Sequence, residues 1–127
     1  MGMDADKIVR SFCEAWGRAD LETIMSAFAE DAVYHNIPME PCKGKEAIRG
    51  FIEGFLKTSP GGIGFEILNQ SVATKGAGAV VLNERVDTFT MDGQHKGIPV
   101  CGVFELNDAG QIVAWRDYFD MGAFQGN

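Results

Sequence analysis

Two hydrophobic periodicities divide the chain, one helical and one extended. In the first half, apolar residues recur every three to four positions, which predicts amphipathic helices. A first helix follows the capping residue Asp4 and ends at Gly17, a second starts at Asp20, and a third covers Lys45 to Thr58. Their apolar stripes are Ile8, Val9, Phe12, Cys13 and Trp16; Leu21, Ile24, Met25 and Phe28; and Ile48, Phe51, Ile52, Phe55 and Leu56.

The third predicted helix contains two glycines one turn apart, Gly50 and Gly54. Each costs about 1 kcal/mol of helix stability relative to alanine. We interpret the pair as a site of close backbone packing.

The second half alternates apolar and polar residues, which predicts strands. Turn residues, among them Asp92-Gly93, separate the strands. Pro99 indicates an edge position or a bulge. A short strand over 31–36 and a loop from Pro38 to Gly44 precede the third helix. The later strands are Phe65–Thr74, Ala79–Met91, Gly97–Asn107 and Gln111–Phe119. Helices followed by an antiparallel meander predict an α+β fold.

The last strand carries a carboxylate among large apolar residues. Alternation places Val113, Trp115, Asp117 and Phe119 on one face, which we expect to be buried. A buried carboxylate is unfavourable unless it is paired or protonated. Asp117 therefore either holds a buried polar network together or takes part in chemistry.

The same alternation supplies polar partners for Asp117. Arg85 and Asp87 share one face of their strand, and Tyr34 and Asn36 share one face of theirs. If these faces line one concave surface, one arginine meets two aspartates, and the less costly state keeps one aspartate protonated. The pair would then supply a general acid and a general base, with Tyr34 and Asn36 able to hold a water molecule.

A purely structural alternative is an Asp-Arg-Asp network that ties strands together. Other chemical candidates are weaker. His35 faces away from Tyr34 and Asn36, and His95 follows a hairpin turn and is expected to be exposed. Cys101 lies within a strand with no histidine partner and is interpreted as a small core residue.

Composition and charge exclude several classes of protein. The 127 residues carry a net charge of −7 and suit one domain spanning 1–127. This charge disfavours nucleic acid or an anionic membrane as a partner, and we find no apolar run long enough to cross a membrane. The three widely spaced cysteines and two histidines contain no zinc-binding pattern. Reduced thiols and the absence of a signal-peptide pattern predict a cytoplasmic protein.

Four blocks of the sequence together resemble the limonene-1,2-epoxide hydrolase family, in the family's order and over about 28–124. They are Tyr34–Pro38, Glu84–Asp87, Gly102–Leu106 and Trp115–Asp120. The resemblance implies a cone of curved, mostly antiparallel sheet with about three helices on its concave face, related to the nuclear-transport-factor-2 and ketosteroid-isomerase folds. It also implies a homodimer.

The resemblance further implies roles for the polar residues. Asp117 matches the base that deprotonates water, Tyr34 and Asn36 match the residues that hold that water, Asp87 matches the acid that protonates the epoxide oxygen, and Arg85 matches the bridge between the carboxylates. The implied reaction opens an apolar, cyclic or terpenoid-like epoxide to a vicinal diol without metal, cofactor or covalent intermediate. The expected apolar lining of the substrate site is Ile37, Met39, Phe55, Leu68, Ile98, Val100 and Phe104.

Two alternatives keep the same fold. In one, the protein is an isomerase, lyase or polyketide-cyclase type enzyme in which Asp117 removes a carbon-bound proton. The water-holding residues and the Arg85–Asp87 pair argue against this reading. In the other, the protein is a non-catalytic domain that binds small apolar molecules.

Overall fold

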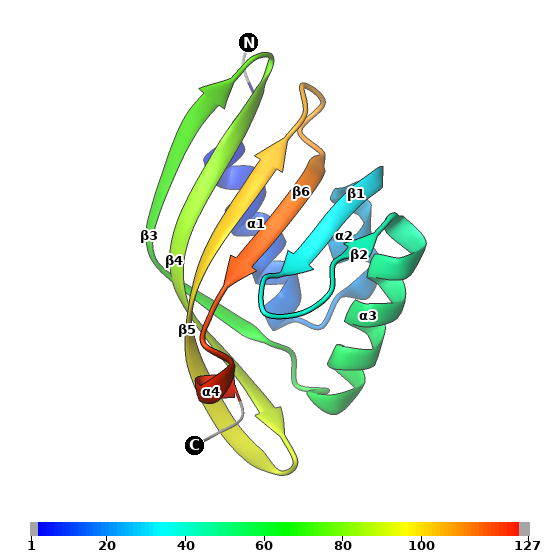
Figure 1. Cartoon of the computed structure of the whole chain (residues 1–127), viewed down its shortest axis with the longest axis vertical. Coiled ribbons are helices and arrows are strands. Elements are labelled where there is room, and N and C mark those ends of the chain that lie inside the picture. The colour runs from blue at the N-terminus through cyan, green and yellow to red at the C-terminus, as the bar shows by residue number, and fades with distance from the viewer. Residues whose placement is uncertain (1–2, 125–127) are drawn as a thin grey trace.

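A computed structural model describes residues 3–124 as a curved six-stranded sheet with helices packed on its inner face (Figure 1). The elements are α1 (Ala5–Gly17), α2 (Leu21–Ser26), β1 (Phe28–Asn36), β2 (Cys42–Lys43), α3 (Lys45–Thr58), β3 (Gly64–Lys75), β4 (Gly78–Met91), β5 (Gln94–Leu106), β6 (Ile112–Tyr118) and α4 (Met121–Phe124). The predicted α+β order is confirmed. None of the described helices combines the length and apolar character needed to cross a membrane.

The strand order in the sheet is β2-β1-β6-β5-β4-β3. All neighbouring pairs are antiparallel except β1 and β6, which are parallel. The parallel contact brings the early strand with Tyr34 and Asn36 beside the last strand, where Asn36 is in register with Asp117. This one crossover unites residues that are about eighty positions apart in sequence.

The helices form where the apolar stripes predict them. The side chains of Asp4 and Asp20 cap α1 and α2 by accepting hydrogen bonds from the backbone N–H groups of Lys7 and Thr23. The predicted bounds of α3 are correct. Phe28, which the sequence pattern assigned to the second helix, instead begins β1 and is fully buried there.

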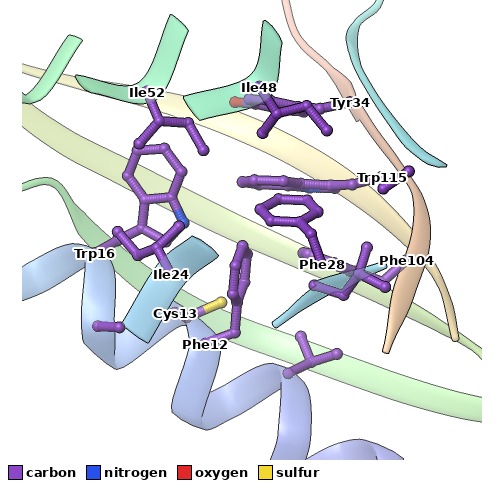
Figure 2. Packing of buried hydrophobic residues seen from close by; sticks show 14 of the residues in the cluster. Phe12, Cys13, Trp16, Ile24, Phe28, Tyr34, Ile48, Ile52, Phe104 and Trp115 are labelled. Atoms are coloured by element: carbon purple, nitrogen blue, oxygen red, sulfur yellow. The ribbon is translucent and has the colours of Figure 1, made fainter. Parts of the chain in front are cut away.

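The centre of the core is the indole ring of Trp115. It stacks on Tyr34 from β1, with ring centroids 4.1 Å apart, and on Phe104 from β5, with centroids 5.2 Å apart. Phe12 from α1 meets the same indole edge-on at 5.0 Å (Figure 2). These contacts tie α1 to the middle of the sheet, directly beside the residue pair Asn36 and Asp117.

Bulges in β3 and β6 shift the inner and outer faces relative to the simple alternation. In β3, Ile67 pairs with Arg85 and Asn69 with Glu84, so that Leu68 is the extra residue and points outward. In β6, a second bulge leaves Val113 outside the core and places Ile112 in it. The expected inward position of Val113 is therefore wrong.

Pro99 lies in β5 beyond the end of its pairing with β6, which begins at Cys101. At Pro99, β5 is therefore paired with β4 on one side and has no paired strand on the other. Proline, which has no N–H, is accommodated there, in agreement with the expected edge position. Cys101 pairs with Glu84 and Tyr118 on the outer face and is exposed. Its assignment to the core is wrong, because the inward position next to it belongs to Gly102.

Candidate active site

The guanidinium of Arg85 occupies the centre of the inner face and is fully buried. Its Nε and Nη2 donate to the two carboxylate oxygens of Asp87 at 2.9 and 2.8 Å. Its Nη1 and Nη2 donate to the two oxygens of Asp117 at 3.2 and 2.9 Å. A fifth hydrogen bond runs from Nη1 to Oδ1 of Asn83 at 3.0 Å. A guanidinium has five N–H donors, so every one of them has an acceptor.

The register of the sheet explains why Arg85 fits between two strands. Asp117, Gly102 and Asn83 are in register across β6, β5 and β4. A Cβ atom on Gly102 would overlap Nη1 of Arg85 and lie 2.9 Å from Oδ1 of both Asn83 and Asp117. The missing side chain of Gly102 therefore leaves the space through which Arg85 reaches Asp117.

Asp117 accepts more hydrogen bonds than Asp87. Besides the two from Arg85, its Oδ1 accepts one from the indole Nε1 of Trp115 at 2.7 Å. Asp87 accepts two from Arg85 and is in register with Phe65 and Ile98, both apolar. Asp117 therefore has one side-chain hydrogen bond more than Asp87, and its donor, Trp115, lies in the same strand.

Burial dominates the protonation of the other groups. Desolvation raises the pKa of Asp87 to about 6, although its hydrogen bonds and charge interaction with Arg85 act in the opposite direction. Burial also raises the pKa of Tyr34 well above its usual value, which keeps the phenol neutral. For Arg85, desolvation alone would lower the pKa, but the two carboxylates raise it well above its usual value. The site thus holds a permanent cation beside Asp87, whose pKa of about 6 lies above that of an ordinary aspartate.

A small cavity of about 40 Å³ lies against these groups. Its polar wall consists of Tyr34, Asn36, Asp87 and Asp117, and the hydroxyl of Tyr34 is 3.5 Å from Oδ1 of Asn36. The rest of its wall is apolar: Trp16, Phe55, Ile63, Phe65, Phe89, Ile98, Val100 and Phe119. The structure therefore brings together all five residues predicted to form the polar site, with Arg85 behind the two carboxylates.

The predicted apolar lining is only partly present. Phe55, Ile98 and Val100 line the small cavity, and Met39 lines a larger neighbouring one. Leu68 is half exposed on the outer face, because the β3 bulge reverses its direction.

Two other expected lining residues contribute differently. Phe104 is fully buried behind Trp115 as a core residue. Ile37 lies outside both cavities, and its backbone N–H donates to the carbonyl of Asp117 at 2.9 Å. Leu68, Phe104 and Ile37 are therefore not part of the cavity wall.

Several residues of the site were not predicted. Asn83, Phe89 and Phe119 share strand faces with the predicted residues, so alternation could have added them. Trp16 comes from the end of α1 and lines the small cavity, and its buried indole N–H has no hydrogen-bond partner within the described part of the chain. No sequence pattern distinguishes Trp16 from an ordinary core tryptophan. Within residues 3–124, no three His, Cys, Asp or Glu side chains are grouped so that they could hold a metal ion.

Comparisons with known proteins address the family and the fold of the chain. The model of the limonene-1,2-epoxide hydrolase catalytic domain matches residues 3–125. Epoxide hydrolase EphG of Mycobacterium tuberculosis is 34% identical over 113 residues, which span 89% of this chain and 71% of that protein. A solved structure of an M. tuberculosis LEH-like epoxide hydrolase has a TM-score of 0.74 and 32% identity, covering 96% of this chain and 87% of that one.

A second solved structure, Bal32a from a soil-derived mobile gene cassette, has a TM-score of 0.80 and covers 94% of this chain and 92% of that one. At 23% identity, it shows likeness in fold alone.

The position of Gly102 can be tested by substitution with alanine. Because the new methyl group overlaps Arg85, we expect Gly102→Ala to lower the free energy of unfolding by about 1–3 kcal/mol. Gly97→Ala in the same strand is the matched control, since its Cβ would make ordinary contacts at 3.5 and 3.6 Å. Denaturant unfolding of both variants measures the difference. Equal stability of the two variants would contradict the proposed packing.

Proposed function

Because this chain belongs to the limonene-1,2-epoxide hydrolase family, we propose that it adds water in one step to an apolar epoxide and releases a vicinal diol. The observation that carries the proposal is the pair of buried carboxylates bridged by one guanidinium beside a largely apolar cavity. Two identical side chains in different surroundings can act as acid and base at the same pH.

In the proposed reaction, Asp117 is the general base. It takes a proton from a water molecule held by Tyr34 and Asn36, and the water oxygen forms a bond to one epoxide carbon. As the carbon–oxygen bond of the ring breaks, Asp87 gives its proton to the leaving epoxide oxygen. A proton then returns from Asp117 to Asp87 through water, which restores both groups.

Three features support these roles. Asp117 accepts three hydrogen bonds, which favour the carboxylate needed in a base. Asp87 has a pKa raised by burial to about 6, as a proton donor requires. Arg85 contacts both carboxylates and has no N–H left for substrate, so its proposed role is to position them and to balance their charge.

The proposed acid–base pair predicts the effect of two substitutions. Asp117→Asn and Asp87→Asn each remove one proton transfer, so we expect kcat/KM for cyclohexene oxide or limonene oxide to fall by about 10²–10⁴. Asp108→Asn is the matched control, because it makes the same change in the exposed turn before β6. Folding of the variants is checked by circular dichroism. Full activity of Asp117→Asn would sink the mechanism, and proton exchange from a ketone without water addition would favour an isomerase.

The origin of the added oxygen separates direct water attack from a covalent ester on aspartate. In a single turnover in heavy-oxygen water, direct attack puts the heavy isotope into the diol at once. An ester route would put an unlabelled carboxylate oxygen into the diol instead. Label in the protein after turnover would therefore contradict the one-step reaction.

The raised pKa of Asp87 predicts how activity depends on pH. A general acid must be protonated, so kcat/KM should decrease as pH rises through about 6. Epoxides do not titrate, so this limb reports the free enzyme. The remaining activity of Asp87→Asn should lack the limb. An unchanged kcat/KM up to pH 8 in the wild type would contradict the assignment of Asp87 as the acid.

We also propose that the protein is a homodimer that uses the outer face of the sheet. This face exposes Leu68, Leu82 and Tyr118 by between 44% and 50%. Large apolar side chains grouped on one face are typical of protein contacts. The family resemblance is the second support.

A charge placed on the outer face tests the dimer. Sedimentation should give twice the chain mass of 13.8 kDa for the wild type and the chain mass for Leu82→Asp. Ala109→Asp, in the exposed turn before β6, adds the same charge elsewhere and should leave the dimer intact. A monomeric wild type would contradict the proposal.

A cytoplasmic location and a single domain over 1–127 remain part of the proposal. Cys13, Cys42 and Cys101 are all free thiols, which fits a reducing compartment. The buried apolar residues of the described chain form a cluster shared by the helices and the sheet, which fits one domain.

A further inference from the structure

The cavity beside the two carboxylates is too small for a whole substrate. Its volume is about 40 Å³, whereas one water molecule needs roughly 10–15 Å³ on the same scale. Binding sites for small organic molecules usually measure about 300–1,000 Å³. The inner cavity therefore accommodates a water molecule and the reacting ring, and the remainder of the substrate lies elsewhere.

A second cavity of about 450 Å³ adjoins the first. The two share Asn36, Phe55 and Phe119 as wall residues. We call the second cavity the α3 groove, since most of its wall comes from that helix. The complete wall is Asn36, Met39, Gly50, Phe51, Gly54, Phe55, Thr58, Met91 and Phe119. In Figure 1, α3 runs beside the sheet toward the end at which the β4–β5 hairpin lies, and β6 points toward the same end.

Two exposed glycines of α3 border the open space of the groove. A Cβ atom built on Gly50 or on Gly54 meets no atom within 4 Å. The interpretation of these glycines as a close-packing site is therefore wrong. Each glycine costs about 1 kcal/mol of helix stability relative to alanine, and the structure shows no packing contact that offsets this cost. What the glycines do provide is width in the groove.

The shape and chemistry of the α3 groove restrict what can occupy it. Between Gly50 and Thr58, α3 advances by about 12 Å, which gives an elongated wall. No charged side chain lines it, and Asn36 and Thr58 are the polar side chains of the described wall. An extended apolar chain suits this lining, whereas a carboxylate or an ammonium group would find no charged partner along the wall.

We propose that the α3 groove binds the tail of the substrate and that Gly50 and Gly54 determine substrate specificity. The substrate class is an epoxide at or near the end of a long, uncharged, linear apolar chain. This inference rests on the proposed function for the identity of the reacting group. The binding of the tail itself depends on the groove alone.

A leucine at position 54 tests the proposal, because its side chain would fill the groove. Leucine and alanine have similar helix propensities, so Gly54→Ala controls for the gain in helix stability. Glu53→Leu controls for an added leucine, since Glu53 is exposed on the same helix and does not line the groove. Gly50→Leu is a second blocking variant.

The first readout is the ratio of kcat/KM for 1,2-epoxydodecane to that for 1,2-epoxybutane. Full burial of one methylene strengthens binding about fourfold, so even partial burial of the longer chain should favour it at least about tenfold in the wild type. We expect Gly54→Leu and Gly50→Leu to lower this ratio by about tenfold or more. Gly54→Ala should lower it much less, and Glu53→Leu should leave it unchanged.

The second readout does not require turnover. Calorimetry compares the binding of dodecane-1,2-diol and butane-1,2-diol to the wild type and to the two leucine variants at 50 and 54. If the wild type binds the long diol more tightly and both leucine variants lose this preference, the groove proposal is supported. This result would stand even if no epoxide is hydrolysed and the proposed reaction fails. Hydrolysis of epoxides with no chain-length preference, or with a preference that both leucine variants keep, would overturn the groove proposal and leave the reaction standing.

Discussion

The structure depends on one buried cation, the guanidinium of Arg85. Removing such a charge from water costs several kcal/mol unless it is paired and all its hydrogen bonds are made. Here the five N–H groups are shared among Asp87, Asp117 and Asn83. This requirement accounts for the glycine at position 102 and for the polar side chain at position 83. It also accounts for the strand order, in which β5 with Gly102 separates β4 with Arg85 from β6 with Asp117.

The same constraint produces the proposed chemistry. One fixed positive charge cannot neutralise two carboxylates, and most of the wall around them is aromatic or aliphatic. Asp87 is the carboxyl group whose pKa is raised by burial. Asp117 instead accepts an additional hydrogen bond from Trp115. Trp115 thus links the core to the site, because its ring stacks on Tyr34 and its N–H orients Asp117.

The polar site could be predicted from the sequence because strand alternation is regular where it matters. Arg85 and Asp87 lie in an unbroken part of β4, and Asp117 lies beyond the bulge of β6. Alternation failed at the bulges, where Leu68 and Val113 point away from the core. Neither the parallel contact of β1 with β6 nor the empty space beside Gly50 and Gly54 has a local sequence signal, since both depend on tertiary packing.

The separation into acid and base requires that Asp87 carries a proton up to about pH 6. Nuclear magnetic resonance of protein labelled at the aspartate carboxyl carbons measures the protonation of each group directly. We expect one carboxyl signal that titrates near pH 6 and is absent from Asp87→Asn. If both Asp87 and Asp117 are ionised throughout the range from pH 5 to pH 8, the separation into acid and base is contradicted.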